Sequence, residues 1–343
     1  MKKKSLALIA LGGVLVMALA GCGTTQAPTA ADPDASGSTS AGCGDDTTAT
    51  STGAVSVTDD LGRTVELDKP AERIAVLEWQ QIEDALSLCI TPVAVADAEG
   101  YSTWVTAEEL PEGVTDVGTR QEPNLETLFG TEPDLVIVEV SAADDPIVSQ
   151  LEAYDVPVLA TVGADAADPI AKMLGTLDLI AQVTGREERA AVVADEFQEH
   201  LDAASAELAD LDVPTKEFVF FDGWVDGGNV ALRPFGQGSL VGEIGEKLGL
   251  ENAWTGEVDP TYGLGQTDVE GMTTVGDANL FYTGTEDPES ESFIDALQGN
   301  PAWTSLPAVA DDRLTAFPAG IWTFGGPRST QQIIDGYVEV LSK

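Results

Sequence analysis

Basic residues are scarce in this chain. It has 16 lysines and arginines against 59 aspartates and glutamates, and its formal net charge is −43 at pH 7. Such an excess of negative charge repels the phosphates of nucleic acids, so we expect no nucleic-acid partner. The acidity does not identify a fold. Because basic residues are so few, an arginine that follows a strand end is a candidate for a specific role.

Metal-binding and hydrolytic motifs are missing as well. The single histidine, His200, falls in a long polar helix expected over residues 187–211, where a surface position is expected. Zinc sites usually take several histidine or cysteine ligands, and Ser-His-Asp hydrolysis needs a histidine in a suitable setting. No Gly-x-x-x-x-Gly-Lys phosphate loop occurs. We therefore predict no metal site, no cofactor and no enzymatic activity.

Cysteine is rare, with three residues. Cys22 is explained by lipidation, as described below. Cys89 lies on the apolar face of a helix expected over residues 80–89, which is typical of a small core residue. A bridge between Cys43 and Cys89 is possible, but it would pin a flexible segment to a core helix, so we do not expect it.

The N-terminus carries an export signal. Lys2, Lys3 and Lys4 precede an uncharged apolar run over residues 5–20, which ends in Leu-Ala-Gly before Cys22. This run is shorter than the roughly 20 residues of a membrane-spanning helix, and the small residues before a cysteine are typical of a lipoprotein signal peptide. We predict that residues 1–21 are removed and that a lipid on Cys22 anchors the exported protein to the outer face of the cytoplasmic membrane.

The segment that follows has the composition of a linker. Residues 22–54 are rich in Thr, Ala, Ser, Gly and Asp and have almost no large apolar side chain. Such a segment buries too little apolar surface to offset its ordering entropy, so we predict a flexible tether.

The remaining chain alternates between strands and helices. It comprises roughly 290 residues, which is large for one simple core and suits two lobes. Continuous apolar strands separated by helices indicate parallel sheets that are covered on both faces. We predict an α/β fold of two Rossmann-like lobes, residues 55–165 and 187–343, joined by a single long helix at residues 166–186, with a ligand cleft between the lobes.

One segment of the first lobe concentrates the functional signals. Residues 116–126 read Asp-Val-Gly-Thr-Arg-Gln-Glu-Pro-Asn-Leu-Glu. Arg120 follows a short apolar strand and precedes an expected helix, which is where open α/β sheets place ligand contacts. Glu126 falls in the first turn of that helix, where the helix dipole favours a carboxylate. We interpret Arg120 as a ligand contact and Glu126 as a partner contact; a surface ion pair is the alternative for Arg120.

A family resemblance runs through both lobes. In the first lobe it rests on Val-Leu-Glu-Trp at residues 76–79, on Thr-Pro-Val-Ala-Val-Ala-Asp at 91–97 and on the 116–126 segment. In the second lobe, Leu-Gly-Leu at 248–250 and Asn-Ala-Trp at 252–254 give a looser match. Residues 55–343 thereby resemble the ferric-hydroxamate-binding proteins, in the helical-backbone class of ABC-transporter substrate-binding proteins.

The resemblance implies roles for particular residues. Arg120 would donate hydrogen bonds to the iron-chelating oxygens of a siderophore, for which a charged, fixed fork of donors is suited. The resemblance also implies an aromatic cleft lining, with core packing as the alternative for each residue, at Trp104, Tyr262, Trp322 and Phe324. For Trp79 and Trp254, core packing is the expected role. Glu126 and Glu270 would each present a carboxylate to arginines of the two permease subunits.

Departures from the family pattern bear on the ligand. An aromatic residue expected after the strand at residues 135–138 is missing, because the loop there reads Glu-Val-Ser-Ala-Ala-Asp-Asp. Two further arginines, Arg233 and Arg328, are expected near the cleft. Three converging arginines would favour an anionic ferric carboxylate such as ferric citrate. Arg120 with aromatic residues alone would favour a neutral or cationic ferric hydroxamate, which is the ligand that we predict.

The sequence therefore predicts a monomeric, membrane-tethered receptor that hands a ferric siderophore to an ABC permease. Iron would arrive already coordinated, so the protein would need no metal ligands of its own. Haem or a corrinoid in the same fold is an alternative, although haem needs an axial ligand. An exported two-lobed hydrolase that uses paired carboxylates in the cleft is the alternative from a different class.

Overall fold

The computed structural model describes residues 43–142, 144–283 and 292–343, all of which belong to one unit. The predicted signal peptide, Cys22 and the first part of the predicted tether lie outside these residues. Within them, each helix is either too short or too polar to span a membrane.

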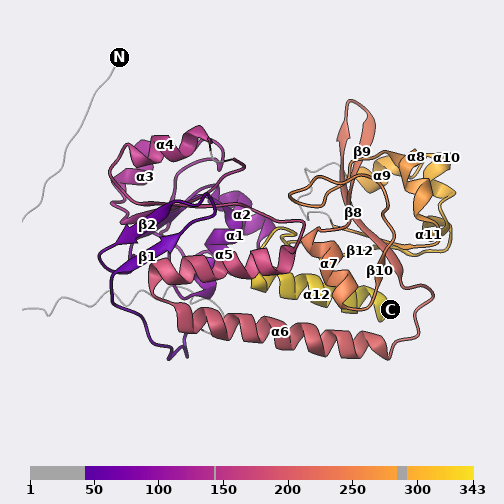
Figure 1. Ribbon diagram of the computed structural model, residues 1–343. Helices are drawn as coiled ribbons and strands as arrows, with labels where there is room; N and C mark the ends of the chain where they lie inside the picture. The colour runs from indigo at the N-terminus through magenta and orange to yellow at the C-terminus, as the bar shows by residue number, and fades with distance from the viewer. Residues whose placement is uncertain (1–42, 143, 284–291) are drawn as a thin grey trace, which may run out of the picture. The chain divides into compact units, whose positions relative to one another are not determined.

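The first lobe is built on a parallel sheet with strand order β5-β4-β3-β6-β7 (Figure 1). Its strands are β3 (Ile74–Val76), β4 (Ala94–Val95), β5 (Thr115–Asp116), β6 (Leu135–Glu139) and β7 (Val158–Thr161). Its helices are α1 (Trp79–Ser87), α2 (Ala98–Trp104), α3 (Leu125–Gly130) and α4 (Pro146–Glu152). An antiparallel hairpin, β1 (Val55–Thr58) and β2 (Thr64–Leu67), precedes the sheet in the chain.

Strand alternation places different residues on the two faces of this sheet. Ile74 and Val76 pack on one face with residues of α1, whereas Ala75 and Leu77 pack on the other with Leu128 of α3 and Leu151 of α4. Both faces are buried because successive side chains of a strand point in opposite directions. The predicted doubly covered parallel sheet is confirmed. Residues 101–104, which were expected to form a loop, instead complete α2, because Asp97 caps its N-terminus by accepting a hydrogen bond from Gly100.

The second lobe contains a sheet with order β10-β8-β11-β12, to which β9 adds antiparallel to β8. Its strands are β8 (Glu217–Asp226), β9 (Asn229–Phe235), β10 (Glu251–Asn252), β11 (Asn279–Tyr282) and β12 (Leu314–Ala316). Its helical segments are α7 (Leu240–Lys247), α8 (Val269–Met272), the 3₁₀ turn η1 (Thr273–Val275), α9 (Phe293–Leu297), α10 (Pro301–Thr304), α11 (Pro307–Ala310) and α12 (Pro327–Leu341). The β8–β9 hairpin was not expected from the sequence.

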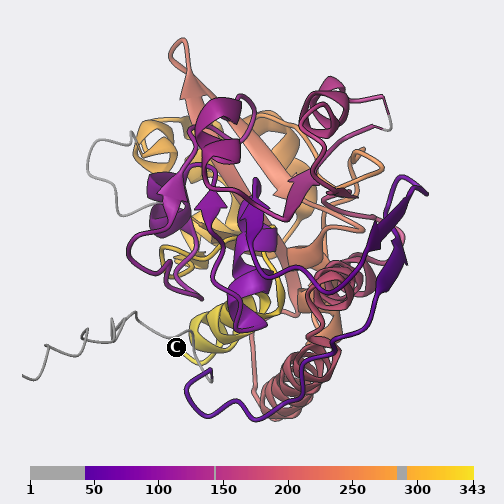
Figure 2. The ribbon, with the colours of Figure 1, turned by 90° about the vertical axis from the view of Figure 1, so that its left-hand side faces the viewer.

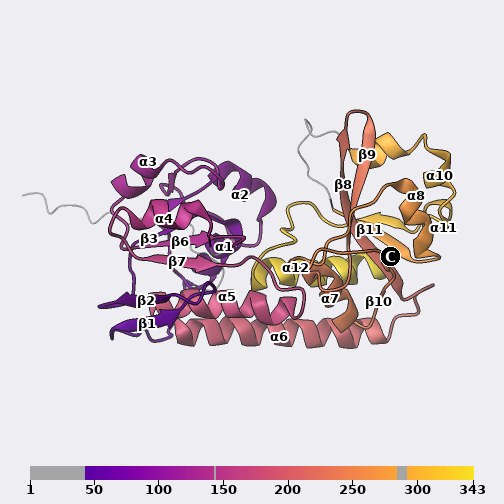
Figure 3. The same cartoon turned by 45° about the horizontal axis from the view of Figure 1, so that its top comes forward.

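Two consecutive helices connect the lobes. The predicted linking segment forms α5 (Pro169–Thr184), and α6 (Glu187–Ala209) follows after Gly185, whose φ of 69° ends α5. Both helices contribute to two apolar cores: Ala190 and Val193 of α6 pack in the first lobe, and Phe197 and Leu201 pack in the second. Figure 3 shows α6 running beneath the elements of both lobes. The connection is therefore a helical pair, where a single helix was expected.

A buried carboxyl joins α1 to α12. Glu83 is fully buried, and its Oε1 accepts a hydrogen bond of 2.9 Å from the backbone N–H of Ser329, in the first turn of α12. The Ser329 hydroxyl donates to the other oxygen. The N-cap of α12 is Gly326, which has no side chain to accept a hydrogen bond from the first turn. Glu83 accepts it instead. A Cβ at Gly326 would clash with Asp84, so glycine permits this close approach.

Burial also changes the acidity of this carboxyl. It raises the pKa of Glu83 to about 7, and the neighbouring Glu108 adds to the shift while the hydrogen bonds from Ser329 oppose it. Burial likewise raises the pKa of Asp84 well above its ordinary value, and Glu83 adds to that shift. The carboxyls at the α1–α12 contact therefore favour their neutral forms.

We predict that Glu83→Gln flattens the pH dependence of stability. With a folded pKa of about 7 against 4.5 for the free group, the contribution of Glu83 is complete below pH 4.5 and is lost as the pH rises to about 7. The full shift corresponds to at most about 3–4 kcal/mol. Glutamine keeps an acceptor for Ser329 N–H and can donate to its hydroxyl.

Urea unfolding between pH 4.5 and 8 measures this effect. The free energy of unfolding of Glu83→Gln should exceed that of the wild-type chain at high pH and approach it at low pH. Glu66→Gln, which changes an exposed residue of β2, is the matched control and should follow the wild-type curve. Parallel curves for wild type and Glu83→Gln would contradict the assignment.

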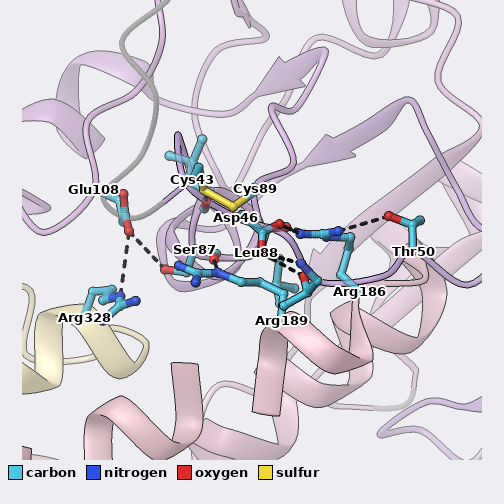
Figure 4. The surroundings of a disulfide bond; sticks show 12 residues. Cys43, Asp46, Thr50, Ser87, Leu88, Cys89, Glu108, Arg186, Arg189 and Arg328 are labelled. Atoms are coloured by element: carbon cyan, nitrogen blue, oxygen red, sulfur yellow. Dashed lines mark hydrogen bonds and ion pairs between the residues drawn. A yellow bond between two sulfur atoms is a disulfide. The ribbon is translucent and has the colours of Figure 1, made fainter. Parts of the chain in front are cut away.

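Cys43 and Cys89 form a disulfide, so the expectation that they are not bridged is wrong (Figure 4). Their Cα atoms are 5.5 Å apart. Cys89 is not part of the face of α1; it follows the helix with a φ of 64°, which turns the chain toward Cys43. Disulfides persist in oxidising compartments, which agrees with the predicted export.

Polar contacts hold the segment after Cys43 as well. Arg186 pairs with Asp46, donates to Thr50 Oγ1 at 3.0 Å and donates to the Leu88 carbonyl at 2.9 Å. Ser51 N–H donates to the Gly185 carbonyl at 2.8 Å. Figure 2 shows this indigo segment passing the start of α6 before it enters β1. The composition indicated a free tether because the segment has almost no large apolar side chain. The contacts that hold it are polar and come from residues distant in the sequence, which composition does not reveal.

We predict that Cys43→Ser/Cys89→Ser lowers the free energy of unfolding by about 2–4 kcal/mol, because the bridge closes a long loop in the unfolded chain. Its two cysteines are 46 residues apart. Limited proteolysis of the double variant should also cleave near residues 43–54. A reducing agent should lower the melting temperature of the wild-type chain but not that of the variant. Equal stability of the two chains under oxidising conditions would contradict the prediction.

Candidate functional site

A cavity of about 260 Å³ lies between the two lobes. Residues of both lobes line it: Glu78, Arg120, Glu139, Gly163, Arg233, Tyr262, Leu264, Trp322 and Phe324. Five of the predicted binding residues, Arg120, Arg233, Tyr262, Trp322 and Phe324, are therefore brought together.

The first lobe supplies its lining residues from strand ends. Glu78 follows β3, Glu139 is the last residue of β6, and Arg120 lies in the turn after β5. These strands are parallel, so their carboxyl ends meet at one edge of the sheet, the usual place for ligand contacts in open α/β sheets. Gly118, with a φ of 93°, allows the tight turn that precedes Arg120.

Arg120 is held by charge and by aromatic stacking. Its Nη1 lies 2.5 Å from Oε1 of Glu78, and its guanidinium carbon lies 3.8 Å from the ring centroid of Trp79. The Trp322 ring centroid is 5.8 Å away. A guanidinium stacked on indole keeps its edge donors available for a ligand. The side chain is 22% exposed. Arg120 thus lies in the cavity, where the ligand contact was predicted. It also forms an ion pair, but with a residue of the cavity lining, whereas the alternative was a surface ion pair.

Arg233 is held in the same manner from the second lobe. Its Nε and Nη2 contact the two carboxylate oxygens of Asp222 at 2.9 and 2.5 Å, which is a bidentate pair across the β8–β9 ladder. Its guanidinium carbon lies 5.5 Å from the centroid of Phe324 and 5.9 Å from that of Trp224. Each arginine of the cavity thus has a carboxylate partner.

Glu139 has a different environment. Its Oε1 accepts a hydrogen bond of 3.0 Å from the Tyr262 hydroxyl, and its Oε2 accepts one of 3.1 Å from Gln81 Nε2. Burial raises the pKa of Glu139, and the nearby negative charge of Glu78 adds to this effect. Burial and Glu139 together raise the pKa of Tyr262, which keeps its hydroxyl protonated as the donor.

Aromatic rings form one wall of the cavity. The centroids of Trp322 and Phe324 are 5.2 Å apart, and those of Tyr262 and Phe324 are 5.6 Å apart in an edge-to-face contact. Trp79 supports this wall from the core side, 4.7 Å from Trp322. Such a wall offers apolar area with little loss of side-chain entropy on binding. Trp79 and Trp254 are buried, as their expected core roles require.

Two predicted binding residues do not line the cavity. Trp104 is half-buried and packs against the core of the first lobe. Arg328, at the start of α12, lies 2.5 Å from Glu196 of α6 and 3.9 Å from Glu108. Arg328 is the second residue of α12, and from there its side chain extends to these carboxylates. The three arginines expected near the cleft therefore do not converge.

The two predicted docking residues lie on the surface. Glu126 is exposed in the first turn of α3, and Glu270 is exposed in the first turn of α8, one in each lobe. Cys22, the predicted lipidation site, falls outside the described residues.

Sequence reasoning did not single out Glu78, Glu139, Gly163 or Leu264 as cavity residues. A signal for the two glutamates was present, because each follows an apolar strand of the parallel sheet directly. In the described part of the chain, no group of three or more His, Cys, Asp or Glu side chains is arranged to hold a metal ion.

Comparisons with known proteins agree with this fold. A family sequence profile described as periplasmic binding protein matches residues 74–319. The iron(3+)-hydroxamate-binding protein FhuD of Escherichia coli (strain K12) is 26% identical over 262 residues, which cover 76% of this chain and 84% of that protein. The putative ABC transporter substrate-binding lipoprotein YhfQ of Bacillus subtilis (strain 168) is 25% identical over 302 residues, which cover 84% and 87%.

A solved structure supports the same arrangement. The siderophore-binding protein FhuD from Vibrio cholerae, crystallised with Fe3+-Desferal, superposes with a TM-score of 0.67 at 23% identity, over 79% of this chain and 97% of that one. The two-lobed α/β fold predicted from the sequence is confirmed.

Proposed function

We propose a function from the premise that this chain belongs to the periplasmic binding protein family: it captures a ferric siderophore outside the cytoplasmic membrane and delivers it to an ABC permease. Members of this family bind solutes, and the chain is a substrate-binding protein and not an enzyme, as predicted. The observation that carries the proposal is the cavity in which a stacked Arg120 faces an aromatic wall.

The chemistry of the lining suits a chelate whose iron is already coordinated. Chelating oxygens carry partial negative charge. The donors of Arg120 that face neither Glu78 nor Asp97, which lies 3.9 Å from its Nε, are available to them. The rings of Trp322 and Phe324 would pack against the organic shell of the siderophore. Iron would need no ligand from the protein. The cavity of about 260 Å³ is smaller than most small-molecule sites, so part of the chelate would project from its mouth.

Charge favours a hydroxamate over a carboxylate siderophore. Arg120 and Arg233 each have a carboxylate partner, Glu78 and Asp222, and Glu139 adds a further carboxylate to the lining. A ferric carboxylate such as ferric citrate is anionic and would meet these groups unfavourably. Ferric hydroxamates are neutral or cationic. The name of the Escherichia coli relative, which specifies an iron hydroxamate, supports the same choice.

The other ligand and function classes gain less support. An axial ligand for haem would have to come from Tyr262, whose hydroxyl is engaged by Glu139. Glu78 and Glu139 both line the cavity, and a hydrolase would need two such carboxylates. However, Glu78 is neutralised by Arg120, and family membership favours binding without turnover.

Lipid anchoring and docking complete the proposal. The family is exported, and the signal peptide with Cys22 supports a lipid anchor on the outer face of the cytoplasmic membrane. The name of the Bacillus subtilis relative, a substrate-binding lipoprotein of an ABC transporter, supports both the anchor and the permease partner. Glu126 and Glu270 would each contact arginines of one permease subunit, and the loaded receptor would act as a monomer.

We predict that ferric hydroxamate quenches the tryptophan fluorescence of the mature domain, because Trp79 and Trp322 lie beside Arg120. Arg120→Ala should weaken binding about 10- to 100-fold, as expected for lost charge-assisted hydrogen bonds. Arg328→Ala, which removes an arginine outside the cavity, is the control and should bind as the wild-type chain does. Titrations with ferric citrate and haem should show much weaker quenching. Tight binding of ferric citrate that depends on Arg328 would overturn the hydroxamate assignment.

We predict that Glu126→Ala/Glu270→Ala abolishes import of radioactive iron–siderophore into cells but leaves the affinity of the purified domain unchanged. Both side chains are exposed, each in a different lobe, so their removal affects docking alone. The matched control is Glu199→Ala/Glu207→Ala, which removes the same charge from the exposed face of α6. Normal import by the Glu126/Glu270 variant would exclude these residues as the docking pair.

A further inference from the structure

Glu139 is the one carboxylate of the cavity lining that forms no direct ion pair with a basic side chain among the described residues. Glu78 is paired with Arg120, and Arg233 is paired with Asp222. Glu139 receives only the neutral donors of Gln81 and Tyr262. Arg120 attracts this carboxylate without contacting it, so among the described residues no basic side chain pairs with it directly.

Its surroundings hold this carboxylate in one orientation. Gln81 is buried and donates both to Glu139 and to Thr161 Oγ1, at 2.9 Å, so its amide is fixed between them. Tyr262 reaches Glu139 from the other lobe. A Cβ at Gly163 would collide with Tyr262 Oη and Glu139 Oε1, so a glycine there leaves room for this pair. The position of Glu139 is thus specified by several elements.

We propose that Glu139 is a specificity-determining residue that selects ferric hydroxamates carrying a positively charged group, such as a primary ammonium, over neutral ones. This inference rests on the proposed function. The ammonium of the ligand would lie against Glu139 at the cavity wall and supply the partner that Arg120 and Arg233 do not provide. Burying a carboxylate without a partner is costly, so a cation brought by the ligand gains more there than at an exposed site.

The charged groups that face Glu139 act in opposite directions. Glu78 disfavours its ionised form, and Arg120 favours it; the hydrogen bonds from Gln81 and Tyr262 also favour it. Because burial is the largest influence and raises the pKa of Glu139, protonation removes its charge at a higher pH than for an exposed glutamate. Selection of the cation should therefore weaken as the pH falls.

A matched pair of ligands tests the proposal. Ferrioxamine B is a linear ferric tris-hydroxamate with a free terminal ammonium, and its N-acetylated form has the same iron centre without that charge. The wild-type domain should bind the ammonium form at least about fivefold more tightly, as expected for a charge-assisted hydrogen bond. In Glu139→Gln the ratio should fall to near 1, because glutamine removes the charge. Its amide oxygen keeps the acceptor for Tyr262, while its NH2 group replaces the oxygen that accepts from Gln81.

Two controls separate a local effect from a general one. Glu122→Gln makes the same change in net charge at an exposed residue outside the lining and should keep the wild-type ratio. The ratio of the wild-type domain should decline on acidification, whereas that of Glu139→Gln should not change. Melting temperatures of all variants confirm that each domain is folded.

The outcomes are distinguishable. Equal affinity of the wild-type domain for the two ligands, or a ratio that persists in Glu139→Gln, would overturn the role of Glu139 while leaving the hydroxamate receptor intact. Failure of both ferric complexes to bind the folded domain would overturn the proposed function, and this inference with it.

Discussion

The buried contact between Glu83 and the first turn of α12 links the ligand cavity to the framework of the molecule. Helix α1 is buried along its whole length, and its N-cap, Glu78, pairs with Arg120 in the cavity. Its middle carries Glu83, which binds α12 through Ser329. Its end leads to Cys89 and the disulfide. One helix of the first lobe thus positions a cavity carboxylate, a contact with the second lobe and the anchor of the N-terminal segment.

The scarcity of basic residues explains why the arginines of this chain are engaged in ion pairs. With 16 basic side chains against 59 acidic ones, each arginine has several possible carboxylate partners. Arg186 holds the segment after Cys43, and Arg328 ties α12 to α6. Arg120 and Arg233 are neutralised within the cavity. A cavity whose arginines are already paired is poorly suited to an anion, which is why its charge pattern bears directly on the class of siderophore.

Much of the fold could be predicted because local pattern and tertiary environment agree. The apolar run at β6 is buried on both faces, and the periodic pattern of α5 ends at Gly185, as the sequence indicated. The β8–β9 hairpin was missed because its second strand contains Arg233 and Pro234, which interrupt an apolar pattern. The site was predicted in part: Arg120 was found from its place after a strand, whereas Glu139 was interpreted as a loop residue.

The sequence alone indicated export and the two-lobed α/β class, since these depend on local composition and periodicity, and its resemblance to the family implied Tyr262, Trp322 and Phe324 as cleft residues. Only the tertiary structure decided which charges meet. The pairing of Arg120 with Glu78, the diversion of Arg328 to Glu196 and the bridge from Cys43 to Cys89 each join residues that are far apart in the chain. Such contacts depend on how the elements pack together, and in a chain with so many possible carboxylate partners no local pattern specifies them.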